Sequence, residues 1–266
     1  MQFKRLSLVI LLLGILILSV FPATAQVDES LIADYTTNLP QGWGALSAEA
    51  LFTEIIEGNE LFLLDVREPA ELESDGYIFG AVNVPVRSVA QNLNMLPADL
   101  DAPIVVYCKA GTRGAIVMSA LQILGYTNVR NLSGGIGAWV GEEYELITEP
   151  YVAPEPGEAA PIDEALVASV DDYLVNVLPQ GWGVVRSDGL FTELLEGPEL
   201  FILDVREQAE LDDLGYIEGA YHIPLREVGT RLDEIPMDMP IVIYCKKGHR
   251  GAIAMVALQM LGYEAR

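Results

Sequence analysis

The feature that most constrains the fold is a duplication, because the second half of the chain repeats the first. The segment Leu-Pro-Gln-Gly-Trp-Gly at 39–44 returns unchanged at 178–183, which is 139 positions later. Further matches keep this offset until a two-residue deletion reduces it to 137. A repeat of this length is a whole domain rather than a short solenoid unit. The chain of 266 residues is therefore expected to fold as two copies of one domain.

Both cysteines of the chain occupy the same position of the repeat. Cys108 follows the apolar run 104–107, and Cys245 follows the apolar run 241–244. Such runs are typical of buried parallel strands. A glycine and then a periodic apolar segment come next, so each cysteine is expected between the carboxyl end of a strand and the N-terminus of a helix. Ligands bind at that edge of open α/β sheets, and the helix dipole there favours a thiolate over a thiol.

Apolar runs alternate with helical patterns through each repeat. This order predicts a mostly parallel, doubly wound α/β sheet with helices on both faces. In the first repeat we expect strands at 61–66, 81–84, 104–107 and 128–132, and helices at 47–57, 68–73, 88–95, 112–124 and from Gly134 onward. Residues 26–38 are interpreted as a polar lead-in. The second repeat ends at Arg266, before the counterpart of the last strand and helix, so we expect its C-terminal end to be truncated.

The chain divides into four predicted parts. Lys4 and Arg5, an apolar run at 6–20 and Ala-Thr-Ala before Gln26 indicate a signal peptide over 1–25. The apolar run is short for a membrane-spanning helix. We expect a first domain at 26–148, a linker rich in Pro and Glu at 149–161, and an incomplete second domain at 162–266. The protein is predicted to be exported, either periplasmic or extracellular, with no stable membrane insertion after cleavage.

Composition narrows the possible partners. The formal net charge of −24 argues against nucleic acid as a partner. The two histidines, His222 and His249, align with Asn83 and Thr112, so the first repeat has no Cys–His pair and the chain offers no Cys/His cluster for a metal. We expect no cofactor. A disulfide between the two cysteines is an alternative that we disfavour, because it would require the two loops to meet face to face.

Several ordered motifs resemble the rhodanese family. They are Leu-Asp-Val-Arg-Glu from 64 and 203, Gly-Tyr-Ile from 76 and 215, Tyr-Cys-Lys-x-Gly-x-Arg from 107 and 244, and Gly-Gly…Ala-Trp from 134. The resemblance covers 39–140 and, except for the missing tail, 178–266. It implies a five-stranded sheet whose last strand lies inside the sheet. It also implies a sulfurtransferase whose cysteine carries a persulfide between a small donor such as thiosulfate and a thiol or protein acceptor.

The resemblance and the composition of the loops indicate the site residues. Cys108 and Cys245 are the expected nucleophiles. The substrate-binding candidates are Lys109, Gly111, Thr112 and Arg113 in the first repeat, and Lys246, Lys247, Gly248, His249 and Arg250 in the second. The residues expected to line the pocket or to act as scaffold are Asp65, Arg67, Asp204 and Arg206, and a scaffold role is favoured for Asp65.

Three interpretations stay open. Arg113 and Arg250 could clamp the sulfonate oxygens of the donor, or could pair with a carboxylate, Asp65 or Glu68 in the first repeat. The histidines are interpreted as surface or loop residues, although His249 could tune Cys245 as a partial cation. The three tryptophans are interpreted as packing anchors.

Two other functions fit the pattern less well. Phosphatases and arsenate reductases of this fold have one more residue between cysteine and arginine, whereas both loops here are Cys-x4-Arg. A persulfide carrier or binding module without turnover is the second alternative. Since the first repeat has the complete set of motifs, we expect residues 26–148 to be active alone.

Overall fold

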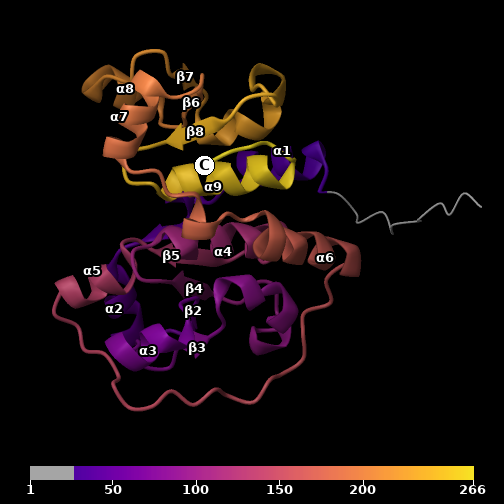
Figure 1. Ribbon diagram of the computed structural model, residues 1–266. Helices are drawn as coiled ribbons and strands as arrows, with labels where there is room; N and C mark the ends of the chain where they lie inside the picture. The colour runs from indigo at the N-terminus through magenta and orange to yellow at the C-terminus, as the bar shows by residue number, and fades with distance from the viewer. Residues whose placement is uncertain (1–26) are drawn as a thin grey trace, which may run out of the picture.

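The computed structural model describes residues 27–266, so the predicted signal peptide lies outside the described part of the chain. Two α/β units stack on each other (Figure 1). The strands of the first unit are β1 (Ala45–Leu46), β2 (Phe62–Asp65), β3 (Val82–Asn83), β4 (Ile104–Tyr107) and β5 (Val129–Leu132). They form a parallel sheet in the order β1-β5-β4-β2-β3. The last strand, β5, lies inside the sheet, as the resemblance implies.

Helices cover both faces of this sheet. They are α2 (Ala48–Ile56), α3 (Pro69–Asp75), α4 (Thr112–Ile123) and α5 (Gly135–Gly141), with 3-10 turns η1 (Gln41–Gly44), η2 (Val86–Ser88) and η3 (Ala90–Met95). Side chains alternate along β4, so Ile104 and Val106 face the core beneath α4, whereas Val105 and Tyr107 face the core beneath α2 and α5. The helix expected at 88–95 is instead a pair of 3-10 turns with a non-helical backbone at Asn92.

The second unit has a smaller sheet. Its elements are α7 (Ser187–Glu196), β6 (Phe201–Asp204), α8 (Gln208–Leu214), β7 (Tyr221–His222), η6 (Leu225–Thr230), η7 (Leu232–Glu234), β8 (Ile241–Tyr244) and α9 (His249–Met260), after the turn η5 (Gln180–Gly183). The parallel strand order is β7-β6-β8. Beside β8 there is one isolated bridge, between Ile241 and Ala265, so within the described residues this unit has no full counterpart of β5. Phe191 is 64% exposed, whereas its counterpart Phe52 stacks on Tyr144.

The N-terminal helix of each repeat lies on the other repeat. The segment interpreted as a polar lead-in contains α1 (Glu29–Thr37), which packs mainly on η6 of the second unit and lies beside α9 (Figure 1). The equivalent segment of the second repeat forms α6 (Glu164–Asp172) and the π-helical turn η4 (Tyr173–Val177). These pack on η3 and η2 of the first unit. The interpretation of residues 26–38 as a lead-in was therefore wrong, and the two units exchange equivalent helices.

A continuous apolar core joins the two units. Helices α4 and α9 pack against each other, and one buried cluster includes Ile32 of α1, Leu174 of η4 and side chains of both units. Two equivalent arginines fix the exchanged segments. Arg226 donates to the carbonyl oxygens of Thr37, Leu39 and Pro40 at 3.1, 2.5 and 2.9 Å. Arg87 donates in the same way to Leu174, Val175, Leu178 and Pro179.

Arg226→Ala is expected to lower the free energy of unfolding by about 2–3 kcal/mol, because several backbone carbonyls lose a charged donor at once. Arg226→Lys should recover only part of this, since an ammonium group cannot reproduce the guanidinium fork. Urea unfolding measures the difference. The matched control is Arg186→Ala, which removes an arginine whose side chain is 84% exposed and should change little. If both alanine variants unfolded alike, Arg226 would not stabilise the contact between the units.

Candidate active site

Both cysteines lie at the carboxyl edge of their sheets, as the sequence predicts. The backbone N–H of Gly111 donates to Sγ of Cys108 at 3.1 Å, and Gly248 does the same for Cys245 at 3.1 Å. These glycines have φ of 96° and 87°, in the left-handed region that allows the loop to curl around the sulfur. Cys108 is 1% exposed and Cys245 is half-buried. Both thiols are free, so the disfavoured disulfide is not formed.

The arginine of each loop forms a bidentate ion pair. Nη1 and Nη2 of Arg113 donate to the two carboxylate oxygens of Glu71 on α3, at 2.6 and 2.7 Å. Arg250 makes the same pair with Glu210, at 2.5 and 2.7 Å. Of the two interpretations left open, the structure shows the ion pair, but with partners other than those named. Glu68 instead caps α3, and Asp65 is paired elsewhere.

The charges in these pairs are stable at neutral pH. Hydrogen bonds from Arg250 lower the pKa of Glu210 to about 2. Hydrogen bonds from Arg113 likewise lower the pKa of Glu71. The pKa of Arg113 is raised, first because Glu71 accepts its hydrogen bonds and also because Cys108 interacts with it. The guanidinium therefore stays charged while the glutamate holds it in place.

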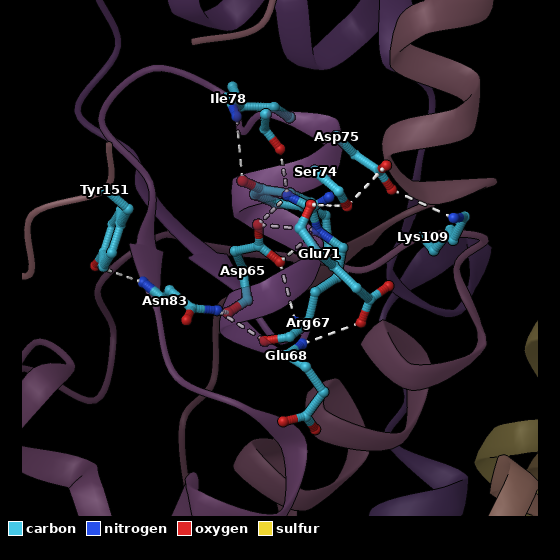
Figure 2. A network of polar contacts seen from close by, with 12 residues as sticks. Asp65, Arg67, Glu68, Glu71, Ser74, Asp75, Ile78, Asn83, Lys109 and Tyr151 are labelled. Atoms are coloured by element: carbon cyan, nitrogen blue, oxygen red, sulfur yellow. Dashed lines mark hydrogen bonds and ion pairs between the residues drawn. The ribbon is translucent and has the colours of Figure 1, made fainter. Parts of the chain in front are cut away.

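Asp65, the last residue of β2, and Arg67 form a buried scaffold (Figure 2). The side chains of Asp65 and Arg67 are fully buried, and Nη2 of Arg67 donates to Asp65 at 2.6 Å and to the carbonyl of Gly76 at 2.8 Å. The pair thereby ties the end of β2 to the residue after α3. Asp204 and Arg206 repeat this arrangement with the carbonyl of Gly215.

The last residues of β3 and β7, Asn83 and His222, complete this scaffold. Asn83 donates from Nδ2 to the carbonyl oxygens of Asp65 and Arg67, both at 2.9 Å. Its counterpart His222 places Nε2 2.7 Å from the carbonyl oxygen of Arg206. His222 is therefore a partly buried strand residue with a structural hydrogen bond, so its interpretation as a surface or loop residue was wrong. Its ring lies on the scaffold rather than on the thiol.

The start of α5 holds the Cys108 loop from the other side. The backbone N–H of Ile136 donates to the carbonyl of Cys108 at 2.7 Å, and that of Gly137 donates to Lys109 at 3.1 Å. Gly135 has φ of 59°, and a Cβ there would lie 2.2 Å from the carbonyl oxygen of Cys108. The signal in the sequence is Gly-Gly-Ile-Gly, which predicted a helix start and matched a family motif but did not indicate a contact with the cysteine loop. These glycines are positioning residues for the loop.

Gly135→Ala is expected to slow alkylation or sulfur loading of Cys108 at least tenfold or to destabilise the first unit by about 1–3 kcal/mol, because the methyl group must displace the loop. The reaction of Cys245 in the same molecule is the internal control and should change little. Gly141→Ala is the matched variant, since a Cβ there meets nothing within 4 Å. Mass spectrometry of the two cysteine peptides and urea unfolding distinguish the outcomes. Equal behaviour of the two alanine variants would contradict the steric argument.

A pocket of about 320 Å³ lies between the units beside Cys245. Residues of both units line it, among them Trp43, Gly111, Thr112, Asn131, Cys245, Lys246, Lys247, His249 and Arg250. Lys246 and Lys247 are exposed and add positive charge at this site. In the first unit, by contrast, Nζ of Lys109 lies 3.3 Å from Asp75 (Figure 2). The structure thus places all the predicted loop residues of the second repeat except Gly248 around one pocket. Residues of the first unit line the rest of this pocket.

His249 is a contact between the units. Its Nε2 lies 2.8 Å from the carbonyl oxygen of Trp43, and its Nδ1 lies 3.1 Å from Nδ2 of Asn131. A carbonyl only accepts, so Nε2 carries the proton and Nδ1 accepts from the amide. Burial lowers the pKa of His249, which keeps the ring neutral at neutral pH. The interpretations of His249 as a surface residue and as a partial cation were both wrong.

Within residues 27–266, no group of three or more His, Cys, Asp or Glu side chains is placed to hold a metal ion. Over the same residues, no helix combines the length and apolar character needed to cross a membrane.

This fold and these loops define a rhodanese-like protein with two units. The chain belongs to the family described as "Rhodanese-like domain", whose family model matches residues 48–142 and 188–265, once in each repeat. "Sulfurtransferase" of Allochromatium vinosum is 33% identical over 110 residues, which is 41% of this chain and 95% of that protein. "Thiosulfate:glutathione sulfurtransferase" of Homo sapiens is 33% identical over 93 residues, 30% of this chain and 80% of that protein. "Thiosulfate sulfurtransferase PspE" of Escherichia coli is 31% identical over 71 residues, 27% of this chain and 67% of that protein. These relatives support sulfur transfer as the general reaction class.

Proposed function

We propose that this protein is an exported sulfurtransferase that moves a sulfane sulfur from a thiosulfate-like donor to a thiol acceptor. The observation that carries the proposal is the surroundings of the sulfur in each loop. Each Sγ accepts a backbone N–H at 3.1 Å, and the arginine that follows each loop is held by a glutamate through two hydrogen bonds. Such surroundings favour a negatively charged sulfur. The names of the relatives support the same reaction class.

The proposed reaction has two displacements. The cysteine thiolate attacks the outer sulfur of thiosulfate, a new S–S bond forms, and the S–S bond of the donor breaks. Sulfite leaves with the electron pair of that bond. An acceptor thiolate then attacks the terminal sulfur of the cysteine persulfide, takes that sulfur as its own persulfide and releases the cysteine thiolate. No proton transfer is required while both thiols are ionised, in accord with the absence of a histidine beside Cys108 in the sequence.

The residues of the loops have distinct proposed roles. The N–H groups of Gly111 and Gly248 stabilise the charge of the persulfide. Lys246 and Lys247 attract a dianionic donor to the interdomain pocket. Export is proposed on the sequence of residues 1–25 alone, and N-terminal sequencing of the protein recovered outside the cytoplasm should begin at Gln26. An intact N-terminus on soluble cytosolic protein would refute export.

One observation disfavours phosphatase or arsenate reductase activity. Both Nη atoms of Arg113 and of Arg250 are occupied by glutamate. They are thus not free to bind a tetrahedral oxyanion, and the Cys-x4-Arg loop leaves less room for one. A persulfide carrier without turnover remains the second candidate, and the experiment below separates it from an enzyme.

The test is persulfide trapping followed by turnover. The purified protein is incubated with thiosulfate and alkylated, and each cysteine peptide is examined by mass spectrometry for one added sulfur atom. Addition of cyanide should then release thiocyanate repeatedly. A single stoichiometric release would indicate a carrier. If neither cysteine gained sulfur, the proposed function would be wrong.

A further inference from the structure

The segment Leu-Pro-Gln-Gly-Trp-Gly returns unchanged in both repeats, and sulfur transfer by itself does not explain it. It forms the turns η1 and η5. Trp43 and Trp182 have φ of 56° and 66°, so both bulky residues adopt the left-handed backbone that side chains rarely take. The glycines on each side are left-handed too. A strained conformation that occurs twice must be fixed by its surroundings, and such residues are concentrated at functional sites.

Each of these tryptophans lies on the active-loop arginine of the other repeat. Cζ of Arg250 is 4.5 Å from the centroid of the Trp43 ring. Cζ of Arg113 is 5.6 Å from the centroid of the Trp182 ring, and Cζ of Arg87 is 5.3 Å from the same centroid. All three distances are within the range of a cation–π contact. The two repeats therefore exchange not only α1 and α6 but also a tryptophan that contacts the active-loop arginine of the other repeat.

Hydrogen bonds from the other unit hold each tryptophan turn in place. Arg226 binds the carbonyl groups of Leu39 and Pro40, just before Trp43, and Arg87 binds the corresponding Leu178 and Pro179. His249 adds a hydrogen bond to the carbonyl of Trp43 itself. The position of the indole is therefore set by the unit on which it acts rather than by its own.

The contact between tryptophan and arginine matters chemically because a single glutamate holds each arginine from one side. Glu71 and Glu210 bind the Nη edge of each guanidinium, but one carboxylate does not fix the tilt of the guanidinium plane. The indole ring beneath Cζ adds a second contact to each guanidinium. Each of these arginines directly follows the loop whose glycine N–H binds the sulfur. The charge that stabilises the thiolate and its persulfide thus depends on a residue of the other repeat.

We propose that Trp43 and Trp182 are positioning residues that act in exchange: Trp43 orients Arg250 beside Cys245, and Trp182 orients Arg113 beside Cys108. Neither active loop is then complete within its own repeat. The proposal rests on the proposed function for the reaction it affects, but the placement of the arginines can be tested without sulfur transfer.

The test uses the full protein with Trp→Leu and Trp→Phe at each position, and follows sulfur loading from thiosulfate at both cysteines of the same molecule. Trp182→Leu should slow the sulfur loading of Cys108 about five- to tenfold, and that of Cys245 by less than about twofold. Trp43→Leu should do the reverse, so each variant is the matched control of the other. Phenylalanine keeps an aromatic face and should retain most of the rate at the affected cysteine.

Several results would overturn the proposal. One is a leucine variant that slows sulfur loading mainly at the cysteine of the tryptophan's own repeat, and another is one that slows loading equally at both cysteines. A third is a phenylalanine variant that loads sulfur no faster than the leucine variant. If a leucine variant did not fold, fluorotryptophan in place of all three tryptophans would keep the shape and weaken the charge of the ring face. The fluorinated protein should then load sulfur more slowly at both cysteines while its unfolding midpoint stays the same. Unchanged loading rates would refute the proposal.

A second readout separates this proposal from the proposed function. The ratio of alkylation by iodoacetate, an anion, to that by neutral iodoacetamide reports positive charge beside each sulfur. Trp182→Leu should lower this ratio at Cys108, and Trp43→Leu should lower it at Cys245. If the unaltered protein formed no persulfide, the proposed function would fail while the ratios still decided the role of the tryptophans. Unchanged ratios would reject that role.

Discussion

Replacement of both Cys108 and Cys245 by serine is expected to abolish thiocyanate formation from thiosulfate and cyanide, a loss of about a thousandfold or more. A serine hydroxyl is not ionised at neutral pH and cannot carry the sulfur as a persulfide. The fold should survive, because both replacements are nearly isosteric. Urea unfolding of the double variant provides that control, and the assay is release of thiocyanate at saturating thiosulfate.

The single variants divide the activity between the loops. Cys245→Ser leaves the first loop, in which Lys109 is engaged by Asp75, and Cys108→Ser leaves the second, with exposed Lys246 and Lys247. We expect the second loop to show the lower KM for thiosulfate. Added salt should raise this KM more than that of the first loop, because it screens the lysine charges. Turnover in the double variant within tenfold of the parent would show that the nucleophile is another group.

Local patterns predicted the elements that carry the cysteines well. The strand expected at 104–107 is β4, and the helix expected at 112–124 is α4 with Leu124 as its C-cap. These predictions succeed because a short apolar run, a glycine at the loop and a long apolar periodic segment each require one local structure. The duplication then transfers them to β8 and α9.

Contacts between the repeats could not be predicted in the same way. Because α1 and the α6–η4 segment occupy equivalent positions of a duplicated sequence, the pattern does not say which sheet each one covers. The same ambiguity hid the role of His249, whose partners lie in the first repeat. The arginine partner was missed for a different reason: Glu68 and Glu71 lie in one helical turn, and the sequence does not show which of the two carboxylates reaches Arg113.

The exchanged helices change what is expected of the first repeat alone. Residues 26–148 retain every sequence motif of a complete rhodanese-like unit, and the sequence predicts that they are active. In the whole chain, however, η4 and α6 cover η2 and η3 of this unit, while α1 packs on η6 of the other. The isolated repeat would lose both contacts and would expose the apolar surfaces that they bury.

We therefore expect residues 26–148 to form a dimer in which two copies exchange α1. The duplication makes the lost contacts equivalent, so Arg87 of one copy can bind the carbonyls of Thr37, Leu39 and Pro40 of the other, as Arg226 does in the whole chain. Trp43 would then lie on Arg113 of the opposite copy. Light scattering should show the dimer, and the activity of Cys108 should rise with protein concentration as it forms.

Two variants make this last prediction specific. Arg87→Ala should weaken the dimer of the isolated repeat, because its guanidinium would bind the exchanged backbone. Trp43→Leu should slow Cys108 about five- to tenfold in the isolated repeat, although in the whole chain it should slow Cys245 instead. This change of target follows only if the tryptophan acts on whichever active loop the exchange places beneath it. A monomer as active as the whole chain at every concentration would show that the first repeat needs no exchanged helix.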